Sequence, residues 1–297
     1  MPAKILDGRQ LAQGIRAQLQ AEVQALAART GQVPHFVNVL IGEDHGACAY
    51  ANSQKRVAEQ IGIRYDLTTL SSEIRQPELV EQIGRLNADP DVHGVMIHQP
   101  VPAHIDYQSV ANGLAMAKDL EGINVANVGK MLLGQTRMIP CTPAAVMEHL
   151  RSTGMDLRGR EAVVVGASHI VGQPLALLLT REMATVTLCH IATSEAGRLA
   201  EHVGRADILV VAVGKAGLIP GDWVKPGAVV VDVGINRVGD QIVGDVDFDS
   251  ARERASYITP VPGGVGPVTV MMLMRNGLQA FKMQLEGCGA AEGRSRG

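Results

Sequence analysis

Six residues near the C-terminus, Pro262–Pro267, have the composition of a main-chain binding site. They read Pro-Gly-Gly-Val-Gly-Pro and lie between a strand-like segment, 257–261, and an apolar run with helical spacing, 268–285. The glycines permit positive φ angles and close approach of a ligand to the backbone, and Pro267 suits the first turn of a helix. Because a helix N-terminus carries partial positive charge, the block predicts a cradle for a polar or anionic group. A tight strand-to-helix turn alone would need fewer prolines and glycines.

A second glycine turn lies in the middle of the chain. The segment from Val163 to Pro174 reads as a buried strand, a turn at Gly166 and a helix that contains Gly172. Such a unit places phosphate groups at the helix N-terminus. The spacing differs from Gly-x-Gly-x-x-Gly, and a plain turn between strand and helix would explain Gly166. It would not explain Gly172, which lets the helix pack closely on a strand or a ligand.

Alternating helix and strand patterns position these two turns. In the first part of the chain, helical patterns alternate with strand patterns, the helices over 10–29, 46–61 and 76–87 and the strands over 35–41, 64–70 and 92–98. A proline-rich joint at Ile139–Pro143 opens a helix that runs to about Gly154. Four more strand patterns follow, over 162–165, 185–189, 208–213 and 228–233. This order predicts mostly parallel sheets with helices on their faces.

The composition argues against several classes of protein. The 297 residues carry a net charge of −3 with only 3% aromatic residues and no long basic run, which disfavours a nucleic-acid partner. No apolar run approaches the ~20 residues that span a bilayer, and no signal-peptide pattern is found. The four cysteines form no Cys-x-x-Cys pair, which fits reduced thiols. No His, Cys or Asp cluster has metal-ligand spacing. We therefore expect a cytoplasmic protein without a metal or a membrane anchor.

Several motifs follow one another in a specific order. Gly166-x-Ser168-x-Ile170-Val171-Gly172-x-Pro174 precedes Asp-Val-Gly-Ile-Asn-Arg at 232–237, Gly-Asp-Val-Asp at 244–247 and the block at Pro262–Pro267. Upstream lie Gly42 with Tyr50 eight residues later, Lys-Asp-x-x-Gly at 118–122 and Pro-Cys-Thr-Pro at 140–143. With this set, the chain from about Ile5 to Leu285 resembles the methylenetetrahydrofolate dehydrogenase/cyclohydrolase family.

The resemblance implies a fold and an activity. We expect two α/β domains that flank a cleft, the second a Rossmann-like, doubly wound parallel sheet. Residues 1–140 and 268–297 would form the folate-binding catalytic domain, and residues 141–267 the dinucleotide-binding domain. Members of the family oxidise methylene-tetrahydrofolate to the methenyl form with a nicotinamide cofactor. Most then hydrolyse the methenyl bridge to formyl-tetrahydrofolate, and the usual assembly is a homodimer.

The folate-binding positions depart from the family pattern. Family members carry a lysine four residues after the tyrosine, on the same helix face. Here Tyr50 is kept, but that position is Gln54, and Lys55 would point about a quarter-turn away. The family's strand end Gln-Leu-Pro is His98-Gln99-Pro100 here, and its Asp-Gly is Glu121-Gly122. The catalytic candidates are Tyr50, Gln54, His98 and Glu121, and the substrate-binding candidates are Tyr50, Gln99, Pro100, Glu121, Pro262, Gly263 and Gly264.

These changes predict which activity suffers. Hydrolysis of the methenyl bridge needs a group that moves protons, and the Gln54 amide cannot titrate; losing such a group costs ~10²–10⁴-fold. Hydride transfer mainly needs two rings to be positioned. We therefore expect a dehydrogenase whose cyclohydrolase step is weak or lost. Two alternatives stay open: a full bifunctional enzyme in which His98 or Lys55 replaces the lysine, and a non-catalytic or altered-ligand paralogue that binds a pterin or a nucleotide. A histidine bonded to backbone at a strand end would explain His98 equally well.

The cofactor positions favour NAD, with NADP as the alternative. Family members that use the 2′-phosphorylated cofactor have an arginine after the first glycine of the turn and a Ser-Arg pair after the second strand. Here these positions are Ala167 and Ile191-Ala192, so the phosphate would lack its charged partner. No acidic residue ends that strand to take the ribose hydroxyls, and Glu195 lies several residues on; His190 or Thr193 would serve instead.

The remaining cofactor contacts are expected at the carboxyl edge of the sheet, where ligands bind in open α/β folds. Asp232 and Asp245 are expected to orient the loops there rather than to take part in chemistry. The full set of expected cofactor contacts is Gly166, Ala167, Ser168, Ile170, His190, Val213, Gly214, Gly234, Ile235, Asn236, Gly264 and Thr269.

Overall fold

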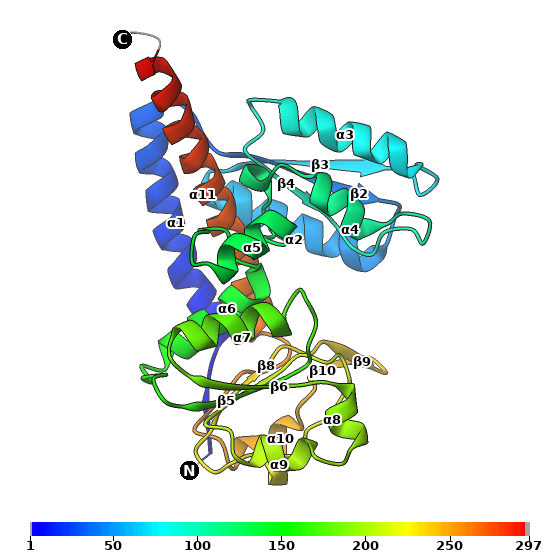
Figure 1. Ribbon diagram of the computed structural model, residues 1–297, viewed down its shortest axis with the longest axis vertical. Coiled ribbons are helices and arrows are strands. Elements are labelled where there is room, and N and C mark those ends of the chain that lie inside the picture. Colours follow the sequence, from blue (N-terminus) through cyan, green and yellow to red (C-terminus); the bar gives the residue numbers. More distant parts are fainter. Residues whose placement is uncertain (1, 295–297) are drawn as a thin grey trace. The chain divides into compact units, whose positions relative to one another are not determined.

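The computed structural model describes residues 2–294, with side chains described as far as Glu286. The chain divides into two compact units. Unit 1 comprises Met1–Gly14 and Pro140–Met272, and unit 2 comprises Ile15–Ile139 and Leu273–Gly297. Each unit contains its own parallel sheet with helices packed on it (Figure 1), so the predicted two-domain α/β fold is confirmed. Residues 295–297, which the expected folate-binding domain included, lie outside the described part of the chain.

Unit 1 is built on a six-stranded parallel sheet in the order β1–β11–β8–β7–β5–β6. Its strands are β1 (Lys4–Ile5), β5 (Glu161–Val165), β6 (Thr185–Cys189), β7 (Ile208–Val211), β8 (Val229–Asp232) and β11 (Tyr257–Ile258). Helices α6 (Cys141–Ser152) and α7 (Gly172–Arg181) lie on one face, and α9 (Leu199–Gly204) and α10 (Phe248–Arg252) on the other (Figure 1). Because both faces are covered, the central strands are almost uninterrupted runs of valine, leucine and isoleucine.

Unit 2 is built on a three-stranded parallel sheet in the order β3–β2–β4. Its strands are β2 (His35–Ile41), β3 (Arg64–Leu70) and β4 (Gly94–Ile97). The helices of this part of the chain are α2 (His45–Ile61), α3 (Gln76–Ala88), α4 (Tyr107–Gly113) and α5 (Val125–Leu132). The strands and helices alternate as the sequence predicts, since a parallel pair of strands needs a crossover helix.

The two faces of β2 have different partners. Val37, Val39 and Ile41 share a buried core with Leu79 and Ile83 of α3. Alternate residues of a strand point to opposite faces, so residues 36, 38 and 40 lie on the other face. That second face is the one that α2 reaches, and it carries the polar cluster described below.

The first residues of the chain belong to unit 1, which differs from the expected assignment of residues 1–140 to one domain. Strand β1 pairs with β11, and the N–H of Gly8 donates to the carbonyl oxygen of Gly263 at 2.9 Å. A Cβ at Gly8 would lie 1.7 Å from the carbonyl oxygen of Gly264. Only a glycine permits this close approach, so backbone packing holds the N-terminal segment in unit 1.

The two longest helices, α1 (Gly8–Thr30) and α11 (Val265–Arg294), each contribute residues to both units. Helix α11 begins three residues before the predicted Val268, which puts Pro267 in its first turn as expected. Strand β4 is shorter than the predicted 92–98, and β7 ends before the predicted Val213. A hairpin of β9 (Asn236–Val238) and β10 (Gln241–Val243) was not predicted, and neither was β1.

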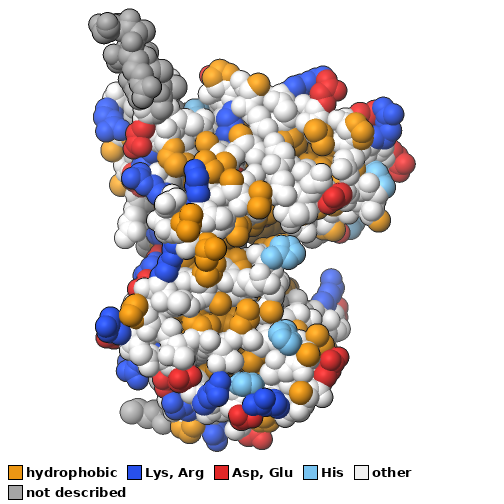
Figure 2. Space-filling model, viewed as in Figure 1, with side chains coloured by type: hydrophobic (Ala, Val, Ile, Leu, Met, Phe, Trp, Pro, Cys, Tyr) orange, Lys and Arg blue, Asp and Glu red, His pale blue; other side chains and the backbone are white. Residues whose placement is uncertain are grey.

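The surface carries mixed charge. On the face that Figure 2 shows, Lys and Arg side chains are interspersed with Asp and Glu, without a continuous basic area. Within the described part of the chain, no helix is both long enough and apolar enough to cross a membrane.

Candidate active site

Helix α2 positions Tyr50 and Gln54 one turn apart. Asp44 caps the helix by accepting a hydrogen bond from the N–H of Ala47 at 2.8 Å, as expected for an aspartate at an N-cap. Tyr50 is 37% exposed, Gln54 is fully buried, and Lys55 is exposed. The prediction that Lys55 points away from the Gln54 face is therefore confirmed, because a neighbouring helix position turns by about 100°.

The Gln54 side chain is held on both sides by hydrogen bonds. Its Oε1 accepts from Asn38 Nδ2 at 2.7 Å and from the hydroxyl of Tyr65 at 3.1 Å. Its Nε2 lies 3.6 Å from the sulfur of Met96. Burial raises the pKa of the Tyr65 phenol, and the nearby Tyr50 adds to the increase. Gln54 therefore lies in a neutral environment in which the amide is both buried and oriented.

His98 follows β4 and faces the same cluster. Its side chain is 1% exposed, and its Nε2 lies 3.3 Å from Asn38 Nδ2. The ring packs edge-on against Tyr50, with centroids 6.1 Å apart. Burial lowers the pKa of His98 to about 4, because an imidazolium in this environment would lose its hydration. His98 is therefore neutral at physiological pH. The residues that follow, Gln99 and Pro100, are exposed.

Glu121 belongs to a second polar group beside this one. The hydroxyl of Tyr107 donates to Glu121 Oε2 at 3.1 Å, and the Gln99 side chain also contacts that hydroxyl. Burial and, to a smaller extent, the Asp119 carboxylate raise the pKa of the Glu121 carboxyl to about 8, while the hydrogen bond from Tyr107 opposes the change. The pKa of Glu121 therefore lies closer to neutrality than that of His98.

Asp119 gives the Glu121 segment its shape. Its carboxylate accepts from the main-chain N–H of Gly122 at 2.9 Å and of Asn124 at 2.8 Å, and from Asn127 Nδ2 at 2.9 Å. These bonds tie the segment to α5 and leave Glu121 between the two anchored ends. The position of Glu121 is therefore set by its neighbours in the chain.

In unit 1, the turn after β5 is tightly packed. Gly166 has φ 111°, and a Cβ there would lie 2.2 Å from the carbonyl oxygen of Ala212. Gly172 is the first residue of α7 rather than an interior one, and its Cβ would lie 1.8 Å from the Gly166 carbonyl oxygen. The predicted close packing at Gly172 is thus confirmed, and its partner is the turn itself.

The same turn presents main-chain donors. Ser168 Oγ accepts from the N–H of Val171 at 3.1 Å, whereas the N–H groups of Ser168, His169 and Ile170 have no acceptor among the described residues. Free N–H groups before a helix N-terminus suit phosphate oxygens. The residues of this turn therefore fit a dinucleotide.

Asp245 and Asp232 hold the neighbouring loops. Asp245 accepts four hydrogen bonds, from the N–H groups of Val213, Gly214 and Lys215 and from Asn236 Nδ2, all between 2.7 and 2.9 Å. Asp232 accepts from three main-chain N–H groups, at Gly234, Asp245 and Val246. Burial raises the pKa of Asp232 to about 6, although those N–H groups lower it. Both aspartates thus hold loops at this edge of the sheet.

The glycine block is packed from within its own unit. Gly263 has φ 107°, and a Cβ at Gly264 would lie 2.6 Å from the carbonyl oxygen of Pro260. The carbonyl of Gly264 also accepts a hydrogen bond from the buried His149. Contacts with Gly8 and His149 thus account for some of the glycines that the sequence pattern had suggested for ligand binding.

Among the other expected cofactor contacts of unit 1, Gly234 is buried, whereas Val213, Gly214, Ile235 and His190 are exposed. Ile235 is 70% exposed, and His190 is exposed at the start of α8 (Ile191–Glu195), where its N–H donates to Thr193 Oγ1 at 3.3 Å. The Thr269 hydroxyl instead donates a hydrogen bond to the carbonyl oxygen of Val265, one turn earlier in α11.

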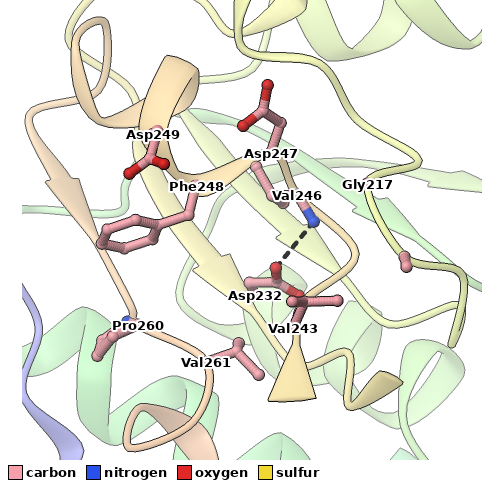
Figure 3. A pocket seen from close by; sticks show the side chains of 11 residues that line it. Gly217, Asp232, Val243, Val246, Asp247, Phe248, Asp249, Pro260 and Val261 are labelled. Atoms are coloured by element: carbon pink, nitrogen blue, oxygen red, sulfur yellow. Dashed lines mark hydrogen bonds between the residues drawn. The ribbon is translucent and has the colours of Figure 1, made fainter. Parts of the chain in front are cut away.

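A separate pocket of about 470 Å³ lies in unit 1. Asp232, Val246, Phe248 and Val261 are among the side chains that line it (Figure 3). The Asp232 carboxylate is turned to main-chain donors, as the bond to Val246 in Figure 3 shows. None of the predicted site residues lines this pocket. In the part of the chain that the structure describes, no group of three His, Cys, Asp or Glu side chains could hold a metal ion.

Sequence models of a known family match both parts of the chain. The model of the tetrahydrofolate dehydrogenase/cyclohydrolase catalytic domain matches residues 6–121, and that of the NAD(P)-binding domain of the same family matches residues 140–285. The chain belongs to this family. The resemblance read from the motifs is therefore confirmed, and the NAD(P)-binding match includes residues 140–272 of unit 1.

Individual relatives agree over nearly the whole length. The chain is 45% identical over 287 residues to the bifunctional protein FolD of Bacillus licheniformis, covering 96% of this chain and 100% of the relative. It is 47% identical over 281 residues to the bifunctional protein FolD 2 of Myxococcus xanthus, covering 94% and 96%. Its fold is similar to that of the Trypanosoma brucei methylenetetrahydrofolate dehydrogenase-cyclohydrolase complexed with NADP and an inhibitor, with a TM-score of 0.92, 38% identity and coverage of 96% and 99%.

Three residues of the polar clusters were not singled out from the sequence. Asn38, Tyr65 and Tyr107 contact the predicted Gln54, His98 and Glu121. The sequence could have pointed to Asn38, since it is the one amide in the mostly apolar strand pattern His-Phe-Val-Asn-Val-Leu-Ile. It could not have pointed to the two tyrosines, because an isolated tyrosine is ordinary in a half-buried strand or helix.

Proposed function

We propose that the protein oxidises methylene-tetrahydrofolate to methenyl-tetrahydrofolate with a nicotinamide cofactor and hydrolyses the methenyl product weakly. One observation carries the second part. The residue in place of the family lysine, Gln54, is fully buried and accepts hydrogen bonds from Asn38 and Tyr65. A neutral amide in this position can orient a ring but cannot exchange a proton.

The oxidation makes few demands on proton transfer. A bound nicotinamide would supply the acceptor for a hydride. The hydride takes both bonding electrons with it when it departs from the methylene carbon. The lone pair of the adjacent folate nitrogen then forms the C=N bond of the methenyl product, so no side chain has to add or remove a proton. The chain's contribution is to hold the folate in position, for which we propose Tyr50, Gln99, Pro100 and Glu121, together with Pro262, Gly263 and Gly264.

Hydrolysis makes a demand that Gln54 and His98 do not meet. Water must lose a proton as it adds to the methenyl carbon, and the bridge nitrogen must gain one as its C–N bond breaks. Gln54 has no proton to exchange, and burial holds the pKa of His98 at about 4. Lys55 is exposed, one residue beyond the buried face of α2. The alternative in which His98 or Lys55 replaces the lysine is therefore poorly supported.

A full bifunctional activity is the second candidate, and Glu121 favours it. Its carboxyl has a pKa raised by burial to about 8, so both protonation states exist near neutrality, as a general acid–base group requires. The relatives of this chain from Bacillus licheniformis and Myxococcus xanthus carry the name bifunctional protein. In this mechanism Glu121 would take the proton from water and return it to the bridge nitrogen.

For the cofactor we propose NAD in preference to NADP. Ala167 follows the first glycine of the turn, and the exposed Ile191 begins α8 after β6. Neither side chain can pair with a 2′-phosphate, whose charge-assisted hydrogen bonds would be lost. The Trypanosoma brucei relative was solved with NADP, so the phosphorylated cofactor is the alternative to test. We also propose that the protein is a homodimer and that it is located in the cytoplasm. The cytoplasmic location is consistent with three free cysteines among the described residues.

The test uses purified protein and two substrates. With methylene-tetrahydrofolate, reduction of NAD and of NADP is followed separately; with methenyl-tetrahydrofolate, loss of the methenyl absorbance is compared with the buffer rate. We expect NAD reduction and hydrolysis close to the buffer rate. Rapid hydrolysis would favour the bifunctional candidate, and its loss in Glu121→Gln would assign it to Glu121. No reduction of either cofactor would support a non-catalytic paralogue.

A further inference from the structure

Asn38 is an unusual residue for its place in the fold. It lies in the middle of β2, the central strand of the unit 2 sheet, where every residue is buried. Its neighbours in register are Leu67 of β3 and Met96 of β4. A buried amide among apolar side chains is costly unless all its hydrogen-bonding groups find partners.

The Asn38 amide is only half satisfied. Its Nδ2 donates to Gln54 Oε1 at 2.7 Å and lies 3.3 Å from His98 Nε2. It also lies 3.6 Å from the sulfur of Met96, and the Asn38 side chain is hydrogen-bonded to the Tyr65 hydroxyl. The Asn38 Oδ1 is buried and has no hydrogen-bond partner among the described residues. An unsatisfied buried acceptor is unfavourable for folding, so Asn38 does not serve stability. An apolar residue of similar size would suit the sheet better.

The contacts of Nδ2 determine the chemistry of His98. An amide NH₂ group can only donate, so the ring nitrogen that faces it has to accept. In neutral histidine only one ring nitrogen carries a proton, and an accepting Nε2 places that proton on Nδ1. Protonation of Nε2 would bring two N–H groups together. Asn38 thus selects one tautomer of His98 and, through the same NH₂ group, orients the Gln54 carbonyl.

We propose that Asn38 is a positioning residue that holds Gln54 and the Nδ1–H tautomer of His98 as one neutral, hydrogen-bonded unit. The catalytic consequence rests on the proposed dehydrogenase function, but the tautomer does not. With Nε2 tied to Asn38 and Gln54 unable to titrate, this wall of the site orients a folate without exchanging protons with it. Asn38, Gln54 and His98 then form one functional set, in which changing one member disturbs the other two.

The tautomer is tested by NMR on ¹⁵N-labelled full-length protein, with His98→Asn used to assign the His98 signals. We expect the neutral Nδ1–H pattern, with an unprotonated Nε2. His93 provides an internal reference, because its Nδ1 accepts from the main-chain N–H of His35 at 3.1 Å and its proton must lie on Nε2. A protonated Nε2 on His98 would overturn the proposal, whatever the activity of the protein.

Two variants test the role of Asn38 itself. Asn38→Asp replaces the donor by an acceptor at constant shape, so His98 should shift to an Nε2-protonated form. Asn38→Val removes the donor, and the single tautomer should give way to a mixture. We expect the dehydrogenase kcat of Asn38→Val to fall about 10–100-fold, as displaced site groups do, with a smaller change in KM.

Val39→Ala is the matched control, because Val39 belongs to the core on the opposite face of β2. It should lower stability without changing the His98 signals or the ratio of kcat to KM. If Asn38→Val keeps both the wild-type tautomer and the wild-type kcat, Asn38 is not a positioning residue. If wild-type protein has no dehydrogenase activity, the proposed function fails, while the NMR result still decides the tautomer.

Discussion

The loops of unit 1 and the polar cluster of unit 2 are held in opposite ways. In unit 1, main-chain N–H groups converge on two aspartates, and glycines let the backbone segments touch. In unit 2, side chains hold side chains, as Asn38 and Tyr65 hold Gln54. In the main-chain arrangement, replacing either aspartate removes the shared acceptor, and replacing a closely packed glycine adds a clash. A side-chain arrangement can be exchanged as a set.

The comparison extends to charge. Asp232 and Asp245 receive three and four hydrogen bonds respectively, so buried carboxylates are stabilised by many dipoles. Glu121 has Tyr107 as its hydroxyl donor, and burial raises its pKa to about 8, compared with about 6 for Asp232. Burial therefore raises the pKa of both carboxyls, and main-chain N–H donors oppose the increase at Asp232.

The largest effect is expected when the side-chain set is replaced. Gln54→Lys combined with Asn38→Val restores a titratable amine and removes the NH₂ group that would face it. Hydrolysis of methenyl-tetrahydrofolate should rise by ~10²–10⁴-fold. Gln54→Lys alone should raise the rate of hydrolysis less, because the lysine ammonium and the Asn38 NH₂ group, both donors, would then face each other. Equal rates in the single and double variants would show that Asn38 and Gln54 act independently.

In unit 1, by contrast, substitution of a packed glycine should destabilise the fold. Gly172→Ala puts a Cβ 1.8 Å from the Gly166 carbonyl oxygen, and overpacking of this kind costs about 1–3 kcal/mol or more. We expect a lower free energy of unfolding in a denaturant titration and weaker cofactor binding. Gly84→Ala in α3 is the control, since its Cβ would meet no atom within 4 Å. It should be neutral or stabilising, by up to about 1 kcal/mol.

Asp245→Asn tests the main-chain network directly. The carboxamide can no longer accept all four hydrogen bonds, and hydrogen bonds to a charged group contribute about 1.5–3 kcal/mol. The free energy of unfolding should fall and the cofactor Kd should rise, because Asp245 holds Val213 and Gly214. Asp249→Asn, at an exposed position of α10, should stay within about 0.5 kcal/mol of wild type. An unchanged cofactor Kd in Asp245→Asn would separate these loops from the cofactor site.

The proposed preference for NAD should shift with one substitution. Ala167→Arg adds a guanidinium after the first glycine of the turn, where a 2′-phosphate would accept charge-assisted hydrogen bonds. The ratio of kcat/KM for NADP to that for NAD should rise about 10-fold, equivalent to ~1.4 kcal/mol. Ala167→Gln, which adds length without charge, should leave the ratio near its wild-type value. If wild type already prefers NADP, the phosphate partner lies elsewhere.

The smallest effect concerns pH. With a pKa of about 8, the protonated fraction of Glu121 falls from about nine-tenths at pH 7 to about half at pH 8. If the acid form binds folate, kcat/KM should halve over this interval in wild type and stay level in Glu121→Gln. Because the folded pKa lies above the unfolded value, folding takes up a proton. The free energy of unfolding of wild type relative to this variant should therefore fall as pH rises from about 4 to about 8.

Much of this could be predicted from local pattern. Buried runs such as 162–165 and the helical spacing over 46–61 predicted β5 and α2 to within a residue, since parallel strands and amphipathic helices have distinct periods. The glycines at Gly166 and Gly172 marked the tightly packed turn after β5. The strand β1 was missed, because two residues carry no periodicity and its pairing with β11 joins chain segments some 250 residues apart.

The sequence by itself determined the family, the order of strands and helices, and the loss of a titratable side chain at Gln54, because each depends on residue identity and spacing along the chain. Only the tertiary structure decided that Asn38 meets both Gln54 and His98, and that burial separates the pKa of His98 from that of Glu121. These properties depend on which groups meet across β2, α2 and β4 and on how completely water is removed from them, and neither is written in any local stretch of sequence.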